Sequence, residues 1–436
     1  MKLKPYLEYT DSGVEWIGEI PEGWNVEKLK FNSEINLDSL PENYDLDFEF
    51  FYLDISNVSK NGEIINTDLM RFEDAPSRAR RIPKSQNTII STVRTYLKAI
   101  AYLDDIPKNF IVSTGFSVLN PHKNIFPRYL YYLVSSDLFV QTIVAYSKGI
   151  AYPAINSSDL ANLPIWYPDI ETQNKISSFL DKKISEIDLT IEKDARLIEL
   201  LKEKRTALIN HVVTKGLDPT VKMKDSGVEW IGEIPEIWES RKIKTFSVVR
   251  RGASPRPIDD PKYFDEEGEY SWVRIADVTA SSKYLYNTTE KLSILGKSFS
   301  VPLEPNELFI SIAGSVGKPI ITKIKCCIHD GFVYFQGLKL DPEYLYYIFI
   351  GGQAFQGLGK LGTQLNLNTE TIGNIKIPHP SKEEQKEITE FLDRKTSKIN
   401  ETIEKIQNKI NLIEEYKKSL IHHVVTGKVD VREVAV

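Results

Sequence analysis

The stretch DSGVEWIGEIPEGW, residues 11–24, recurs as DSGVEWIGEIPEIW at residues 225–238. Only Gly23 and Ile237 differ between the two stretches. A match of this length does not arise by chance, and self-similarity at a fixed distance is the signature of a repeated structural unit. The 436-residue chain therefore contains two copies of one unit, and the second copy begins 214 residues after the first.

Two further pairs of segments support the duplication. FLDKKISEID at 179–188 returns as FLDRKTSKIN at 391–400, and LINHVVT at 208–214 returns as LIHHVVT at 420–426. Both pairs are 212 residues apart. Between these anchors the two copies diverge, although they keep a common frame. Each copy is thus a variable module bracketed by near-constant segments, which favours one scaffold that presents two different recognition surfaces.

The near-constant segments after each module predict long helices. Residues 171–213 contain no proline or glycine, and Gly216 and Gly427 are typical helix stops. Apolar residues recur every 3.5 positions, and six of eight seam positions are apolar in each copy, which indicates a coiled coil. The apolar seam residues are Ile184, Ile187, Ile191, Ile198, Leu201 and Leu208, then Ile399, Ile403, Ile406, Ile410, Ile413 and Leu420.

Each helix needs a partner, because about 41 residues rising ~1.5 Å each make a helix of roughly 60 Å. The simplest partner is the helix of the other copy, packed antiparallel, with a recognition module at each end. The alternative is that each helix packs only on its own module. Arg205 and Lys417 interrupt the seam at the same position, so they either set the register or extend into solvent. Leu200 and Leu412 lie off the seam and suggest a second apolar face for a module or another subunit.

The fold class predicted from these patterns is α+β, with two similar modules joined by two long antiparallel coiled-coil helices in a pseudo-twofold repeat. Short β-rich runs separated by Gly, Pro, Asn and Asp clusters predict strands at 51–55, 88–91 and 111–112, then 272–275, 308–311 and 331–335. Short helices are predicted at 126–134 and 342–349. The expected domains are residues 1–168, 169–215 (helix), 216–380, 381–428 (helix) and 429–436 (tail).

Composition limits the function. A net charge of −6 argues against a lone non-specific DNA binder, which is usually basic. It permits local basic patches, or partners that supply part of the grip on phosphate. No apolar run approaches the ~20 residues that span a bilayer, and residues 1–5 lack a signal-peptide core, so we expect a cytoplasmic protein without a membrane. The adjacent Cys326 and Cys327 are expected in a buried strand.

Basic and polar side chains gather in the variable modules despite the acidic total. Arginine, lysine, asparagine and glutamine on loops make both phosphate and base-edge contacts with DNA. The alternative for any single residue is a solvated surface charge. The candidate DNA-binding residues are Arg78, Arg80, Arg81, Arg94, Lys98, Lys148 and Tyr152, then Arg250, Arg251, Arg256, Arg274, Lys318, Gln364 and Asn366.

No pattern indicates catalysis. Residues 314–319, GSVGKP, depart from the phosphate-binding GxxxxGK[ST] loop, because the first glycine is misplaced and Pro319 replaces Ser or Thr. The adenine-methyltransferase run Asp/Asn-Pro-Pro-Tyr/Phe is absent from the sequence. His422 and His423 lack metal-ligand spacing on one helical face. The sequence therefore predicts no catalytic residues, no metal and no cofactor.

The repeated WIGEIPxxW segment, the helix start EQxxI-x2-FLD at 384–393, the helix end HHVVTGK and the two divergent modules resemble the specificity subunit of type I restriction–modification systems. The resemblance covers essentially the whole chain. In the first copy Thr172-Gln173 replaces Glu-Gln, a small departure.

This resemblance implies a non-catalytic subunit whose two target recognition domains each read one half of a bipartite, asymmetric site in double-stranded DNA. It implies two methyltransferase subunits, which carry S-adenosylmethionine and methylate adenine N6 after flipping the base, and restriction subunits that use ATP and Mg²⁺. The assembled complex would be an adenine-N6 DNA methyltransferase and an ATP-dependent endonuclease. Two rival classes are a coiled-coil protein-interaction scaffold without DNA binding and an enzyme with an unrecognised site in the modules.

Overall fold

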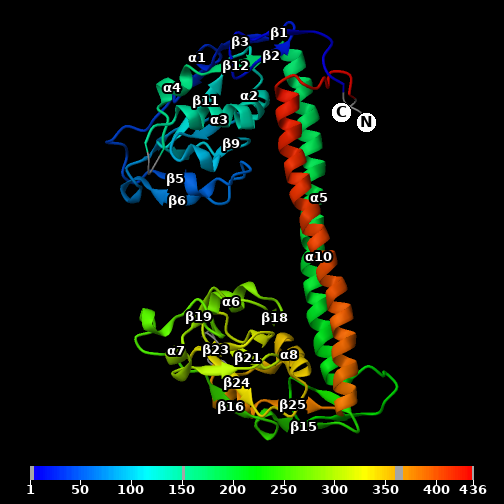
Figure 1. Cartoon of the computed structure of the whole chain (residues 1–436). Coiled ribbons are helices and arrows are strands. Elements are labelled where there is room, and N and C mark those ends of the chain that lie inside the picture. The colour runs from blue at the N-terminus through cyan, green and yellow to red at the C-terminus, as the bar shows by residue number, and fades with distance from the viewer. Residues whose placement is uncertain (1–3, 150–152, 359–366, 435–436) are drawn as a thin grey trace. The chain divides into compact units, whose positions relative to one another are not determined.

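The computed structural model describes residues 4–149, 153–358 and 367–434. The chain packs as two units, one made of residues 1–194 and 408–436 and the other of residues 195–407. Each unit holds one variable module together with parts of two long helices, α5 (Ile170–Lys215) and α10 (Lys382–Val425) (Figure 1). These bounds lie within three residues of the predicted helices at 169–215 and 381–428, and the predicted α+β repeat architecture is confirmed.

Local signals explain where the long helices begin and end. Asp169 caps α5 by accepting from Thr172 N at 2.9 Å. At α10, Ser381 Oγ accepts from Glu384 N at 3.2 Å while the Glu384 carboxylate accepts from Ser381 N at 3.0 Å, which is a capping box. Gly216 and Gly427 follow the last turns with φ of 75° and 70°, a left-handed conformation that glycine adopts at little cost.

In the first unit the start of α5 and the end of α10 run antiparallel. Lys417 Nζ lies 2.6 Å from the Asp188 carboxylate, and Lys409 Nζ lies 2.8 Å from that of Asp194. A residue further along α5 therefore pairs with a residue earlier in α10, so the two helices run in opposite directions. The predicted apolar seam residues are all buried or half-buried, as packing between two paired helices requires.

In the second unit the remaining halves of the helices pair through the equivalent positions. Arg205 Nη1 donates to Asn400 Oδ1 at 2.5 Å. Arg205 and Asn400 are 212 residues away from Lys417 and Asp188 respectively, so the same cross-helix pair occurs once in each unit. The two basic residues that interrupt the seam therefore contact the opposite helix, as a register-setting role requires, rather than extending into solvent.

Module 1 is the variable module of the first unit, and module 2 is the variable module of the second unit. Module 1 is built from two four-stranded sheets. One has the order β6-β5-β10-β7 and the other β4-β11-β8-β9, and only β5 and β10 pair in parallel. Leu53, Ile89, Val112 and Val118 belong to one buried apolar cluster contributed by both sheets. The strands are β4 (Ser33–Ile35), β5 (Glu49–Leu53), β6 (Asp68–Arg71), β7 (Ala79–Arg81), β8 (Thr88–Ser91), β9 (Ile100–Tyr102), β10 (Phe110–Ser113) and β11 (Phe116–Pro121).

Module 2 repeats this plan with an added strand. Its sheets have the orders β19-β17-β23-β20 and β16-β24-β21-β22-β18, and β17 pairs with β23 in parallel as β5 does with β10. The strands are β16 (Val248–Arg251), β17 (Tyr270–Val273), β18 (Tyr284–Leu285), β19 (Glu290–Leu292), β20 (Val301–Leu303), β21 (Leu308–Ser311), β22 (Pro319–Thr322), β23 (Cys326–Ile328) and β24 (Phe332–Gln336).

The remaining elements are short. The predicted strands appear in β5, β8, β10, β17, β21 and β24, and Cys326 and Cys327 are buried in β23 as expected. The predicted helices at 126–134 and 342–349 appear as α2 (Pro127–Ser135) and α8 (Pro342–Ile350). The others are β1 (Tyr9–Asp11), β2 (Glu19–Pro21), β3 (Asn25–Lys28), α1 (Leu29–Asn32), α3 (Asp137–Tyr146), α4 (Ser157–Ala161), β12 (Pro164–Tyr167), β13 (Met223–Asp225), β14 (Glu233–Pro235), β15 (Glu239–Lys242), α6 (Ile275–Ala280), α7 (Ile294–Ser298), α9 (Thr369–Asn374) and β25 (Lys376–His379).

The repeated sequence motifs join each module to both long helices. Buried Gln173 accepts from Phe126 N at 2.8 Å, and its repeat equivalent Gln385 accepts from Asp341 N at 3.0 Å. These amides connect the start of a long helix to the segment before α2 or α8. Burial makes each bond costly to lose, because an unpaired buried amide costs about 1–3 kcal/mol.

The end of the other helix contacts the same module. In module 1 the Trp166 indole donates to Val425 O at 2.7 Å, and in module 2 the Tyr344 hydroxyl lies 3.2 Å from Val213 O. Val213 and Val425 are repeat equivalents from the HVVT segment. In each unit the module thus binds the beginning of one helix and the end of the other. The first unit is therefore discontinuous in sequence, whereas the second is one continuous stretch.

No helix among the described residues is long and apolar enough to cross a membrane.

Candidate nucleic-acid interface

In module 1 several loops meet at one edge of the sheets, which we call loop edge 1 (residues 54–57, 78, 92–98, 113–116 and 153–155). Parallel β5 and β10 both end there, and antiparallel β7 and β11 both start there. Backbone hydrogen bonds connect the loops, from Thr114 N to Arg78 O at 2.7 Å and from Thr92 N to Gly115 O at 2.8 Å. The strand topology therefore brings together residues that are far apart in sequence.

Module 2 has the equivalent loop edge 2 (residues 251–256, 274–279, 312–318 and 329–331). Ile312 N donates to Gly331 O at 2.8 Å, as Thr92 N does to Gly115 O in module 1. Gly252 approaches the turn so closely that a Cβ atom there would lie 2.1 Å from His329 O. Only glycine fits such an approach, so the residue after Arg251 is fixed by packing against the turn.

At loop edge 1, Arg78 is held by two side chains that the sequence analysis did not single out. Its Nε lies 2.8 Å from Asp54 Oδ2 and 3.3 Å from the Tyr52 hydroxyl. The Arg78 side chain is 59% exposed while that of Asp54 is 20% exposed. The hydrogen bond from Tyr52 and the guanidinium of Arg78 together hold the pKa of Asp54 below its usual value against the opposing effect of burial. The carboxylate therefore stays charged and keeps Arg78 in place.

At loop edge 2, Asp330 organises two of the predicted arginines. Arg251 Nε donates to the Asp330 carbonyl oxygen, and Arg256 Nη2 lies 3.1 Å from the Asp330 carboxylate. Ser254 Oγ also donates to that carboxylate at 2.8 Å. This bond and the two guanidinium groups outweigh burial and lower the pKa of Asp330. The structure thus brings Arg251 and Arg256 together around one turn.

Other predicted residues of the two edges have intramolecular roles. Lys318 Nζ donates to the carbonyls of Thr279 and Ser281 at 3.0 and 2.6 Å and so caps the end of α6. Its repeat equivalent Lys98 instead pairs with Asp137 at 2.5 Å, at the start of α3. Neither lysine is a free point charge directed at solvent.

Arg274 and Lys148 are exposed and carry single ion pairs. Arg274 Nη2 lies 2.5 Å from Glu290, and Lys148 Nζ lies 3.9 Å from Asp159. Arg94 is exposed at loop edge 1 and has φ of 52°, and its amide donates to Pro153 O at 2.8 Å. All three remain accessible to a ligand.

Three predicted arginines do not converge on the loop edges. The Arg80 guanidinium lies 4.7 Å from the centre of the Phe72 ring. Arg81 is half-buried on β7, and burial lowers its pKa. Arg250 is exposed on β16, on the face opposite Arg251, because side chains alternate along a strand. Tyr152, Gln364 and Asn366 lie outside the described residues.

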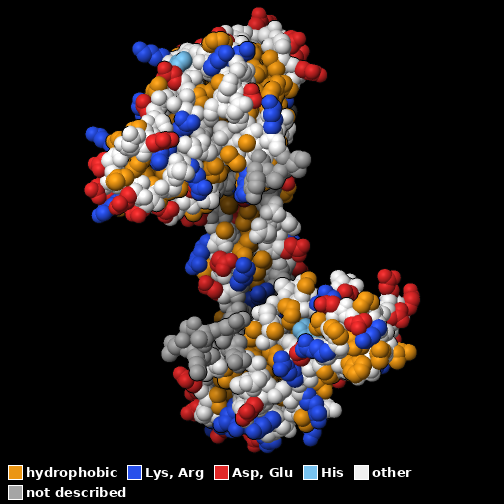
Figure 2. Space-filling model, turned by 90° about the vertical axis from the view of Figure 1, so that its left-hand side faces the viewer, with side chains coloured by type: hydrophobic (Ala, Val, Ile, Leu, Met, Phe, Trp, Pro, Cys, Tyr) orange, Lys and Arg blue, Asp and Glu red, His pale blue; other side chains and the backbone are white. Residues whose placement is uncertain are grey.

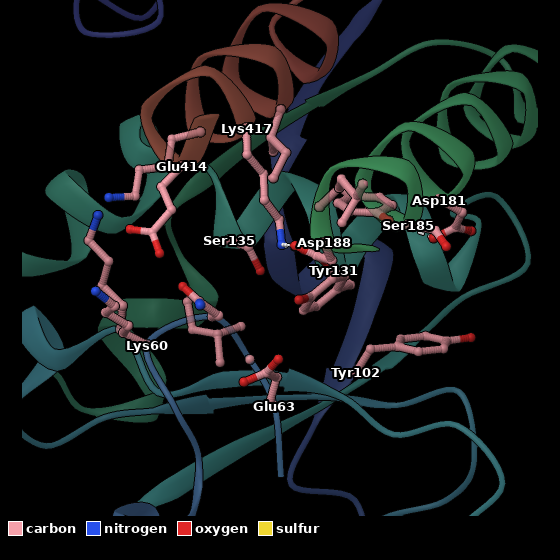
Figure 3. Close-up of a pocket in the computed structure, with 18 of the residues that line it drawn as sticks. Lys60, Glu63, Tyr102, Tyr131, Ser135, Asp181, Ser185, Asp188, Glu414 and Lys417 are labelled. Atoms are coloured by element: carbon pink, nitrogen blue, oxygen red, sulfur yellow. Dashed lines mark hydrogen bonds and ion pairs between the residues drawn. The ribbon is translucent and has the colours of Figure 1, made fainter. Parts of the chain in front are cut away.

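A cleft of about 950 Å³ lies within the first unit, between module 1 and the two helices. Figure 3 shows Lys417 of α10 reaching Asp188 of α5, with Tyr131 and Ser135 of α2 beside them and Lys60 and Glu63 across the cleft. Basic and acidic side chains both line it, and several are already paired: Lys98 with Asp137, Arg128 with Asp181, and Lys417 with Asp188. The mixed lining does not fit a polyanionic DNA backbone, which favours the loop edges as the interface.

Charge is mixed over the visible surface as well. Figure 2 shows lysine and arginine side chains interspersed with aspartate and glutamate on both modules. Phosphate contact dominates non-specific DNA affinity, so such a surface fits selective contacts by a few residues. Among the described residues, no group of three or more His, Cys, Asp or Glu side chains could hold a metal ion.

The comparisons with known proteins agree on one family. The sequence model of the type I restriction modification DNA specificity domain matches residues 39–200 and 235–412. The chain is 27% identical over 345 residues to the type I restriction enzyme MjaVIII specificity subunit of Methanocaldococcus jannaschii, covering 75% of this chain and 76% of that relative.

Solved structures share the fold. A chain from a study of assembly and conformational transition of the type I R-M system superposes with a TM-score of 0.77 at 21% identity, covering 94% of this chain and 99% of that one. The HsdS subunit from Thermoanaerobacter tengcongensis superposes with a TM-score of 0.56 at 20% identity, covering 94% and 98%.

Proposed function

This chain belongs to the type I restriction modification DNA specificity family, and on that premise we propose that it is the DNA-recognition subunit of a type I complex. One observation carries the proposal: the two copies of the module make the same contacts to the long helices but have different residues at their loop edges. Gln173 and Gln385 make the same bond in both units, whereas loop edge 1 carries Arg78 and loop edge 2 carries Arg251 and Arg256. A constant frame with two different edges fits a reader of two different half-sites.

In the proposed assembly each module, residues 1–168 and 216–380, reads one half of a bipartite, asymmetric site in double-stranded DNA. The chain itself is non-catalytic. Two methyltransferase subunits bring S-adenosylmethionine, and restriction subunits bring ATP and Mg²⁺. The negative net charge fits this division, because partners complete the grip on phosphate. The complex works in the cytoplasm, where the DNA is accessible.

Binding of the complex to DNA tests the proposal. The chain is assembled with its methyltransferase subunits and offered a pool of random duplexes at several salt concentrations. The expected result is enrichment of one sequence with two defined parts separated by an undefined spacer. Affinity should fall steeply with salt, because contacts to phosphates release counterions. If no sequence is enriched and the affinity for DNA does not depend on salt, the chain is a protein-interaction scaffold and the proposal is contradicted.

A further inference from the structure

We propose that each half of the DNA site contains a guanine, read in the major groove by Arg78 of module 1 and Arg251 of module 2. This inference rests on the proposed function and specifies its chemistry. It is carried by a feature common to both modules, namely an exposed arginine at the loop edge that is held through its Nε atom.

The hydrogen bonds of Arg78 leave its two terminal Nη groups available to contact a base. Both of its side-chain hydrogen bonds among the described residues, to Asp54 Oδ2 and to the Tyr52 hydroxyl, are made by Nε. The terminal Nη1 and Nη2 groups take no part in those bonds, and the side chain is 59% exposed. Tyr52 is itself held, since its hydroxyl donates to Asp54 at 2.9 Å. The guanidinium is therefore held from its Nε side, on a side chain that is more than half exposed.

Arg251 is held in the same manner by a different partner. Its Nε donates to the backbone carbonyl of Asp330, and the residue is exposed. The next residue, Gly252, bonds to Phe332 O through its amide at 2.9 Å, which fixes the backbone that carries Arg251. Arg256 differs, because its Nη2 is bound to the Asp330 carboxylate. Only Arg251 of this pair keeps both Nη groups outside the interaction with Asp330.

The two arginines contact equivalent turns, although Arg78 precedes β7 and Arg251 ends β16. The β10–β11 turn contains Thr114 and Gly115, and the β23–β24 turn contains Asp330 and Gly331 in the same places. Arg78 accepts from Thr114 N through its carbonyl, and Arg251 binds the Asp330 carbonyl. No sequence alignment would pair Arg78 with Arg251, yet each belongs to the loop edge of its module and is held there through its Nε atom.

Guanine is the base whose acceptors match this donor pair. Its N7 and O6 atoms lie side by side on the major-groove edge and take a bidentate contact from arginine. An arginine held through Nε presents Nη1 and Nη2 together, and the preset position reduces the conformational entropy lost on binding. Adenine has an amino donor where guanine has O6. A guanidinium held in place would therefore meet a donor instead of an acceptor and would bind adenine less well.

The test starts from the site methylated by the assembled wild-type complex, mapped across a genome. Each half should contain a G·C pair. The complex with Arg78→Ala should bind about 5- to 150-fold more weakly, the equivalent of ~1–3 kcal/mol for one bidentate contact, and should accept any base at one G·C pair of one half-site. Arg251→Ala should do the same in the other half-site only. Arg78→Lys and Arg251→Lys, which retain the charge and address any failure to fold, should also relax that position.

Matched controls are Arg71→Ala and Arg241→Ala. Both arginines are exposed and carboxylate-paired, and both lie on strands away from the loop edges; these variants should keep the wild-type specificity. A uniform loss of affinity over all sequences, with a salt slope reduced by about one unit, would identify Arg78 or Arg251 as a phosphate contact and overturn the proposal. Relaxation at an A·T pair would also overturn it. A wild-type complex without any sequence preference would instead contradict the proposed function itself.

Discussion

Each module contacts a long helix through an aspartate at the same repeat position, but the basic residue that pairs with this aspartate differs between the two modules. In module 1, Asp181 of α5 accepts from Arg128 and from the Tyr132 hydroxyl, both on α2. In module 2 the equivalent Asp393 accepts from Lys283 and from the Tyr347 hydroxyl.

The basic residue that pairs with the aspartate comes from a different segment in each module. Glu343 occupies the position of Arg128 on α8, and Lys283, just before β18, pairs with both Glu343 and Asp393. The helix carboxylate and the tyrosine are therefore the fixed parts of the joint, while the module supplies the positive charge from whichever segment reaches it. A variable module can diverge if it keeps the net chemistry of this contact.

The largest effect is expected from Lys283→Ala. The Lys283 side chain is only 12% exposed and faces two carboxylates, so its removal should destabilise module 2 by about 3–5 kcal/mol. Adding Glu343→Arg should restore more than half of the loss, because this places the cation where module 1 has Arg128. Hydrogen exchange of the α8 amides in the full chain measures both. A double variant no better than the single one would show that the two joints are not interchangeable.

The glycines that end the helices should differ in tolerance. An added Cβ at Gly427 would lie 2.3 Å from Pro21, whereas one at Gly216 would lie 3.2 Å from Trp238. Alanine in a left-handed conformation costs about 1–2 kcal/mol in either place, and crowding adds about 1–3 kcal/mol. We expect Gly427→Ala to cost about 3 kcal/mol in denaturant unfolding and Gly216→Ala about half as much. Equal losses would show that the packing around Pro21 relaxes.

Removing the shared carboxylate should harm module 1 more than module 2. Asp181→Ala takes away the ion-pair partner of Arg128, and since both side chains are partly exposed the cost should be about 1–2 kcal/mol. Asp393→Ala should cost about 1 kcal/mol or less, because Lys283 keeps Glu343. The protection of α2 and α8 against hydrogen exchange gives the two values. The reverse order would mean that the tyrosine bond, rather than the cation, dominates the joint.

The smallest effect is expected at the ion pair between Asp194 and Lys409, which joins the two long helices. Asp194, 13% exposed, pairs with Lys409, and the repeat equivalents of these residues are the apolar Ile406 and Leu197. Asp194→Ile with Lys409→Leu should leave stability within about 1 kcal/mol of wild type or raise it. Lys409→Leu alone should be worse than the double change, because it leaves a half-buried carboxylate unpaired. Thermal unfolding compares them.

Much of the scaffold could be predicted from the sequence, because its signals are local and occur twice. The 3.5-residue seam, the terminal glycines and the FLD segments each lie within a few turns of one helix. The partners of Arg205 and Lys417 could not be predicted, since they come from the other copy. The duplication nevertheless indicated that whatever one contacts, the other contacts in equivalent form.

The loop edges were less predictable because their contacts depend on strand order. Arg78, Arg80 and Arg81 are neighbours in sequence, yet their side chains have different surroundings: Arg78 binds Asp54 before β7, whereas Arg80 on β7 lies against Phe72. Asp54 lies 24 residues before Arg78, and no spacing rule links a strand end to a later loop across a parallel β5–β10 pair. The Asp330-Gly331 dipeptide between two β-rich runs does signal a turn, although it does not indicate which arginines bind there.

If each module reads its own half-site, a chain that carries module 1 in both places should change its DNA site in a defined way. Residues 216–380 are replaced by residues 1–168, both long helices are kept, and the variant is assembled with its methyltransferase subunits. Methylated positions are then mapped across a genome. We expect the first half-site to appear twice, as an inverted repeat, and the second half-site to disappear. Continued methylation of the original asymmetric site would contradict this expectation.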